Sequence, residues 1–128
     1  MWITRKLKAA LSGMTERNLD KDAEKVSEWI ASKVWTDPDR TVEQDAQYMG
    51  LPVPYLTSFF KRRFGESFIS FRTRLRIQEA QMLLRLHPDK TMQQIGEMCG
   101  FADRRNFEKH FARMTGERPA RWKRKFGN

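Results

Sequence analysis

The sequence predicts an all-α protein of about seven helices, in which two helix-turn-helix units are joined by one long linker helix. Apolar residues recur at helical spacing along most of the chain, and no stretch alternates apolar and polar residues as a strand does. The composition, with 32% charged residues but only 7 Gly and 5 Pro, is typical of a helical domain. A pattern that begins at Thr41 returns at Thr91, which indicates a duplicated unit.

The repeat aligns Thr41-Val42-Glu43-Gln44 with Thr91-Met92-Gln93-Gln94. Each threonine is placed to cap a helix, and the glutamine three residues later completes a capping box. Each short helix then reaches a glycine, Gly50 or Gly100, a residue that adopts the left-handed conformation at a helix end without penalty. The two units are therefore expected at about residues 41–65 and 91–116.

Each unit continues with a second helix a few residues after its glycine. The first of these is expected at about Val53 to Phe64, directly after Pro52, which has no side-chain acceptor to cap a helix. The second is expected to be capped by Asp103. Its apolar stripe consists of Phe107, Phe111 and Met114.

Three further helices complete the prediction. The linker helix is expected at about residues 67–86, because His87-Pro88 stops a helix there. Its apolar stripe consists of Phe68, Phe71, Leu75, Met82 and Leu86. Upstream, Leu19 to Trp35 predicts an amphipathic helix with Val26, Trp29, Ile30 and Val34 on its apolar side. Downstream, Pro119 is placed to begin a closing helix that carries Trp122 and Phe126.

The predicted helices place residues 19–128 in one folded domain and leave residues 1–18 as a basic N-terminal segment. That segment has no continuous signal-peptide core, because Lys6 and Lys8 interrupt its apolar residues, so we expect a cytoplasmic protein. No stretch has the roughly 20 apolar residues that cross a membrane. One apolar helical face is expected in this segment, and we expect it to pack on the domain or on a partner. Its residues are Trp2, Ile3, Leu7, Leu11 and Met14.

The charge of the chain is unevenly distributed. The 25 Lys and Arg residues against 16 Asp and Glu give a net charge of +9 and a pI near 10.1. Residues 1–40 are nearly balanced, with 8 basic and 7 acidic side chains, so residues 41–128 carry almost all of the excess. A basic field on one folded unit favours a polyanionic partner, with nucleic acid ahead of an acidic membrane.

Several chemistries are not supported by the sequence. Cys99 is the only cysteine, which excludes an internal disulfide and a cysteine-rich zinc site. His87 and His110 are far apart and have no third ligand nearby in the sequence, so no metal site is expected. No nucleophile triad, phosphate-cradling glycine loop or pair of catalytic carboxylates stands out, so we expect no cofactor and no enzyme activity.

The assembled residues resemble the DNA-binding domain of AraC/XylS transcription regulators, over roughly Leu19 to Lys125. The second unit carries the resemblance most fully, with Ile95-Gly96, Gly100-Phe101, Asp103, Phe107, Phe111, Gly116, Pro119 and Trp122. The first unit and linker helix add Gly50, Leu56, Phe60-Lys61, Gly65, Phe71, Arg76, Ala80 and Leu83-Leu84. The resemblance implies a seven-helix domain with two recognition helices in successive major grooves, about one helical turn apart.

On the second recognition helix, four polar side chains lie opposite Phe107 and Phe111 and match positions that the family directs at base edges. They are Arg104, Arg105, Glu108 and Lys109. Arginine suits guanine, because its guanidinium reaches O6 and N7 together. Glu108 is expected either to accept from cytosine or to orient a neighbouring arginine.

The first recognition helix offers less for base recognition. Pro54, Thr57 and Ser58 are the residues expected to face the bases, with Lys61 beside them and Arg62 at the rim. These residues can contact thymine methyl groups and phosphates. Apart from Lys61 and Arg62, none has a long side chain with a hydrogen-bond donor that could reach a base edge. We therefore expect the second unit to supply most of the sequence discrimination.

Candidate phosphate contacts are the cations at the ends of the basic helices. They are Lys61, Arg62, Arg121, Lys123 and Arg124. A solubilising tail is the alternative for the run Lys123 to Lys125. On the linker helix, Arg76 matches a family arginine beside the core and is expected to pair inside the protein. Asp45 stands where the repeat has the apolar Ile95, so it must be exposed or paired, and a linker arginine is the expected partner.

The sequence thus predicts a DNA-binding transcription regulator that acts on double-stranded DNA as a monomer, in the cytoplasm at the nucleoid. The family resemblance implies that it contacts RNA polymerase. Two alternatives stay open. A protein-interaction module, such as an anti-regulator, that retained the fold but lost specific DNA binding is kept open by the apolar N-terminal face and the weak first recognition helix. RNA binding is disfavoured by the scarcity of exposed aromatic residues on which bases could stack. The chain is short enough to be either a stand-alone protein or a part of a larger regulator.

Overall fold

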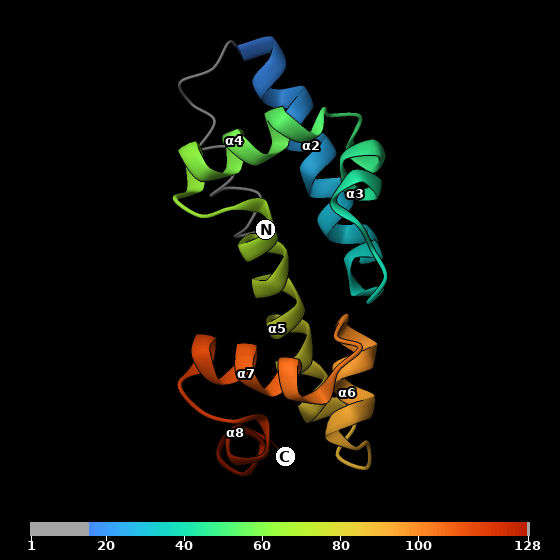
Figure 1. The fold of residues 1–128 in the computed structure, drawn as a ribbon, viewed down its shortest axis with the longest axis vertical. Coiled ribbons are helices and arrows are strands. Elements are labelled where there is room, and N and C mark those ends of the chain that lie inside the picture. The colour runs from blue at the N-terminus through green and yellow to red at the C-terminus, as the bar shows by residue number, and fades with distance from the viewer. Residues whose placement is uncertain (1–15, 128) are drawn as a thin grey trace. The chain divides into compact units, whose positions relative to one another are not determined.

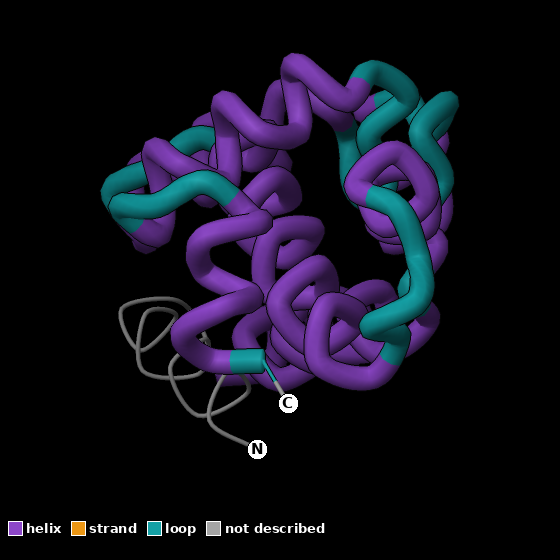
Figure 2. Tube along the Cα trace, turned by 90° about the horizontal axis from the view of Figure 1, so that it is seen from below, coloured by secondary structure: helices purple, strands orange, loops and turns teal. Residues whose placement is uncertain are grey.

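The computed structural model describes residues 16–127, and the side chains from residue 21 onward. This part of the chain consists of helices and loops without a strand (Figure 2). The elements are α2 (Glu16–Ser32), the 3-10 turn η1 (Val34–Thr36), α3 (Val42–Met49), α4 (Val53–Phe64), α5 (Phe68–Leu86), α6 (Met92–Cys99), α7 (Arg104–Thr115) and α8 (Pro119–Phe126) (Figure 1). The prediction of an all-α fold is confirmed. The predicted apolar face at Trp2 to Met14 lies outside the described residues.

The described residues form two compact units. Among the described residues, the first unit contains residues 16–34 and Thr41–Ile69, and the second contains Trp35–Arg40 and residues 70–127. Helix α5 therefore begins in the first unit and continues in the second, where α6, α7 and α8 pack.

In the first unit, α3 begins with the predicted capping box. The Gln44 amide donates to Thr41 Oγ1 at 3.1 Å, and the Thr41 amide donates to Gln44 Oε1 at 3.0 Å. Gly50 ends the helix with φ of 67°. Pro52 is the N-cap of α4 and provides no side-chain acceptor, so the first amides of α4 lack the capping bond that α3 has.

The core of the first unit is aromatic. Trp29 and Phe68 lie with ring centroids 5.1 Å apart, and Phe60 meets Phe68 edge-on at 5.3 Å. All three side chains are fully buried. This core joins α2, α4 and the first turn of α5, and it fixes which side of α4 faces outward.

Asp45, the carboxylate in an apolar position of the repeat, is fully buried and accepts a 2.9 Å hydrogen bond from Trp29 Nε1. Asp45 was expected to be exposed or paired, and its partner is the indole N–H of Trp29 on α2. An additional pair with a linker arginine stays a prediction.

In the second unit, Thr91 and Gln94 repeat the capping box, and Gly100 ends α6. The Asp103 carboxylate accepts from the Arg105 amide at 2.9 Å, which confirms the predicted cap of α7. The buried core consists of Ile77, Ala80, Leu83, Leu84, Ile95, Cys99, Phe101, Phe107, Phe111 and Trp122. Met92 and Met114 pack against it.

Parts of the predicted apolar stripes are wrong. Met82 is 40% exposed and Leu86 is 62% exposed, whereas Leu83 and Leu84 are buried instead. The buried residues in the second half of α5 are Ile77, Ala80, Leu83 and Leu84. Leu84 lies on the opposite side of the helix from Leu75, so the buried side of α5 changes along the helix, whereas the predicted stripe continued the side of Leu75. Met98, an apolar residue on α6, is also 40% exposed.

The first helix also ends earlier than predicted. Helix α2 ends at Ser32, and Lys33 adopts φ of 58°, so Val34 lies in η1 rather than on the apolar stripe of α2. Trp35, in the same turn, is buried.

Arg76 is buried on α5, as the sequence predicted. Its Nε donates to the Trp35 carbonyl at 2.7 Å, and its Nη2 donates to the Asp37 carbonyl at 3.1 Å. A Cβ placed on Gly100 would lie 2.4 Å from Arg76 Nε. The glycine at the end of α6 is therefore required both for its φ of 114° and for the space that the guanidinium fills.

None of the helices within residues 16–127 has the length and apolar character needed to span a lipid bilayer.

Candidate nucleic-acid interface

Helix α7 presents one polar face to solvent because its apolar side is held firmly in the core. Phe107 and Phe111 are fully buried. Gly96 allows close packing, since a Cβ there would lie 3.1 Å from the Phe107 ring. The helix, the Gly100 turn and α6 together form the second helix-turn-helix (Figure 1).

The structure brings the four candidate residues of α7 to this exposed side. Arg104, Arg105 and Lys109 are exposed, and Glu108 is half-buried. Arg104 Nε lies 3.2 Å from Glu108 Oε1, one helical turn away. This ion pair holds the Arg104 side chain along the helix and occupies one oxygen of the only carboxylate among the four.

A hollow of about 520 Å³ lies between α7 and the beginning of α8. It is lined by Arg105, Glu108, Lys109, Ala112 and Arg118. Arg118 is not among the residues that the sequence predicted to contact DNA. The available signal was its position directly before Pro119, where a helix usually has a short capping acceptor and here has a cation.

His110 is the one histidine on α7. Its ring stacks on Phe101 with centroids 5.8 Å apart, and Nδ1 lies 2.8 Å from Arg113 Nη2. Partial burial, followed by the charges of Arg113 and Lys109, lowers the pKa of His110 from its ordinary value. The neutral imidazole is therefore favoured on a helix that is otherwise rich in cations.

In the first unit, α4 buries Leu56, Phe59 and Phe60. The residues predicted to face DNA from this helix are all exposed: Pro54, Thr57, Ser58, Lys61 and Arg62. Tyr55 is held on the inner side, where its hydroxyl donates to Asp22 at 3.0 Å. Burial and this carboxylate raise the pKa of Tyr55.

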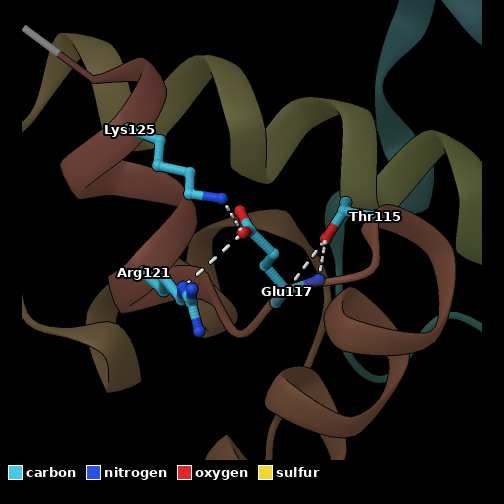
Figure 3. Close-up of polar contacts among 4 residues, drawn as sticks. All are labelled: Thr115, Glu117, Arg121 and Lys125. Carbon is cyan, nitrogen blue, oxygen red and sulfur yellow. Dashed lines mark hydrogen bonds and ion pairs between the residues drawn. The ribbon is translucent and has the colours of Figure 1, made fainter.

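Several basic side chains of α8 make polar contacts within the protein, and Figure 3 shows two of them. The Glu117 carboxylate pairs with Lys125 and, at 3.6 Å, with Arg121. The Glu117 amide in turn donates to Thr115 Oγ1 at 3.3 Å. Lys123 Nζ donates to the Pro88 carbonyl at 2.7 Å. Of the predicted phosphate contacts on α8, Arg124 is exposed with no described partner.

The described residues contain no group of three His, Cys, Asp or Glu side chains that could hold a metal ion.

The two helix-turn-helix units, each with a basic second helix that is capped by Asp103 in the second unit, define the class of helix-turn-helix DNA-binding domains. A comparison with known families gives the family directly. Residues 46–125 match the helix-turn-helix domain model of the AraC type, which covers more than half of the chain. The chain belongs to the AraC-type helix-turn-helix family, as the sequence resemblance implied. This is a family of DNA-binding domains of transcription regulators, not of enzymes.

Individual relatives agree with this placement. The chain is 34% identical over 74 residues to the transcriptional regulatory protein YesN of Bacillus subtilis, covering 57% of this chain and 20% of that protein. It is 35% identical over 72 residues to the transcriptional activator RhaR of Cronobacter sakazakii, covering 56% of this chain and 25% of RhaR. The aligned region thus spans a fifth to a quarter of the length of these relatives.

The fold also matches a solved structure. The DNA-binding domain of the global transcriptional factor AdpA, solved with a target DNA, superposes with a TM-score of 0.69 at 22% identity. The match covers 82% of this chain and 91% of the AdpA domain. At this identity the likeness concerns the fold.

Proposed function

We propose that the protein is a transcription regulator that binds double-stranded DNA sequence-specifically, with α7 in one major groove and α4 in the next. The DNA-binding domain would comprise residues 19–128. The observation that carries this proposal is the exposed polar face of α7, held outward by the fully buried Phe107 and Phe111. Membership of the AraC-type family and the DNA complex of AdpA support the same function.

Within this proposal, the two recognition helices contribute unequally. Arg104 has the bidentate donor that guanine accepts, and the ion pair with Glu108 positions it before DNA arrives. On α4, Thr57 and Ser58 are short and Pro54 has no donor, so this helix would contact thymine methyl groups and the backbone. Lys61 and Arg62 are exposed at its C-terminal half and would contact phosphates.

A chain with two recognition helices needs no second copy to contact two grooves, so we infer that it binds DNA as a monomer. Action on chromosomal DNA would place it in the cytoplasm, at the nucleoid. Regulation of transcription would then involve contact with RNA polymerase.

Selection from a pool of random duplexes by mobility shift tests this function. Enrichment of one motif, with two elements about one helical turn apart, is the expected result. Arg104→Ala should weaken or change the enriched motif, whereas Lys21→Ala, which removes an exposed charge from α2, should leave it unchanged. Salt-sensitive binding without enrichment would contradict the proposal and favour a protein-interaction module.

A further inference from the structure

Three cationic side chains from two helices line the hollow beside α7. Arg105 and Lys109 come from α7, and Arg118 stands at the beginning of α8. Within residues 16–127, none of the three side chains makes a hydrogen bond or an ion pair with the protein. Gathering like charges is unfavourable unless the solvent or a bound anion screens them.

The remaining residues of the hollow do not neutralise this charge. Glu108 is the only acid in the lining, and one of its oxygens is occupied by Arg104 at 3.2 Å. Ala112 contributes only a methyl group, which leaves the space open. The hollow of about 520 Å³ has room for a phosphate group.

Arg118 occupies a position where another residue would stabilise the helix better. It is the N-cap of α8 and makes no side-chain capping bond. A serine there could accept from the amides of the first turn, whereas a guanidinium has no acceptor. Arg118 therefore adds a positive charge to the hollow, while α8 lacks a side-chain capping bond.

We propose that this hollow is a binding site for one phosphate of the DNA backbone, with Arg118 as its principal ligand beside Arg105 and Lys109. The proposal rests on the proposed function and deepens it, because it divides the work of α7. Arg104, held by Glu108, contacts bases. Arg105 and Lys109, for which the sequence predicted base contacts, face the backbone and fix how deeply α7 enters the groove.

Arg118→Ser is the most informative variant, because the serine should cap α8 and raise the melting temperature. A loss of DNA affinity in this variant is then not explained by unfolding. Affinity should fall by the same factor for the selected duplex and for its single-base variants, since a phosphate contact carries no sequence information. The matched control Lys21→Ser removes one exposed positive charge from α2, far from Arg118 in the sequence. This variant should retain the wild-type affinity.

Salt dependence gives a second measurement. Loss of one phosphate contact lowers the slope of log K against log salt by about 0.9. The advantage of the wild type over Arg118→Ser should therefore shrink by about 3.5-fold between 50 and 200 mM salt. An unchanged slope, or a variant that prefers different bases, would overturn the proposal.

Neutral methylphosphonates, placed singly along the selected duplex, identify the phosphate. One position should weaken wild-type binding but leave Arg118→Ser unaffected, because the partner of that phosphate is already missing. If every position weakens both proteins equally, the site is not a backbone contact. Without DNA, inorganic phosphate should raise the melting temperature no more than chloride at equal ionic strength; an Arg118-dependent rise would assign the hollow to a free anion instead.

These results separate the two proposals. Failure of the wild type to enrich any motif would remove sequence-specific regulation, while the salt slope of Arg118→Ser could still be measured on any duplex. Enrichment of a motif with an unchanged slope for Arg118→Ser would remove only the phosphate site.

Discussion

The indole nitrogen of Trp29 donates a 2.9 Å hydrogen bond to a carboxylate oxygen of Asp45, and both side chains are fully buried. In the other half of the repeat, Ile95 occupies the corresponding position and is buried as well. The first unit thus contains a polar bond where the second has an apolar contact. This bond ties α2 to α3.

Removing the acceptor should destabilise the first unit. Asp45→Ala leaves the buried indole N–H without this bond, at a cost of about 1–3 kcal/mol, whereas Asp45→Asn keeps an acceptor and should cost less. Urea unfolding of both variants, followed by circular dichroism, measures the difference. If Asp45→Leu unfolds at higher urea than the wild type and binds DNA normally, the carboxylate is only a tolerated defect.

Gly100 and Gly116 form a matched pair for a second prediction. Both have positive φ, at 114° and 87°, but only the Gly100 Cβ would collide with Arg76, whereas Gly116 faces open space. Gly116→Ala should cost about 1–2 kcal/mol for the left-handed backbone alone. Gly100→Ala should cost more, because Arg76 must also leave the carbonyls of Trp35 and Asp37.

A double-mutant cycle with Arg76→Lys tests the cause. A lysine side chain is slimmer near the collision, so Gly100→Ala should be less harmful in that background, and the two effects should not add. Additive free energies of unfolding would show that Arg76 does not explain the requirement for glycine.

Local signals of the sequence were sufficient for much of this fold. The capping boxes of Thr41 and Thr91, the left-handed Gly100 and the cap at Asp103 depend on residues within a few positions of each other, and all are confirmed. Their chemistry is short-range, so spacing alone predicts it. The outward face of α7 followed in the same way from Phe107 and Phe111.

The features that were missed depend on tertiary contacts. Met82 and Leu86 are apolar, but which side of α5 is buried was decided by packing against the core of the second unit. The partner of Asp45 lies 16 residues away, and the Pro88 carbonyl lies 35 residues from Lys123. Arg118 became a candidate only because folding places it in the same hollow as Arg105.

Cys99 provides a probe of opening in the second unit. It is fully buried, and burial raises the pKa of its thiol to about 12, so almost no thiolate exists at pH 8. Labelling by a disulfide reagent should therefore be slow and should accelerate in proportion to the unfolded fraction as urea is added. Gly100→Ala should speed labelling more than Gly116→Ala. Rapid labelling of the native wild type would contradict this account.

His110 should make stability depend on pH. Because its pKa is lowered in the folded state, the unfolded state binds a proton first as the pH falls below about 6.5. Stability should therefore decrease on acidification, from the ordinary histidine value down through the folded pKa, and level off below it. His110→Gln should remove this part of the profile, measured by urea unfolding between pH 5 and 7.5. An unchanged profile would assign the dependence to other groups.

The unequal roles of α7 and α4 lead to a prediction about specificity. Arg104→Ala should relax discrimination at one base pair, by about 1–3 kcal/mol, because a bidentate contact to guanine is lost. Thr57→Ala and Ser58→Ala should each cost less, since a single hydroxyl discriminates weakly. Binding isotherms on the selected duplex and its single-base variants separate these effects from the uniform loss expected of Arg118→Ser. If the α4 variants lose more specificity than Arg104→Ala, then the first unit is the main recognition element, and the ion pair with Glu108 serves only to stabilise α7.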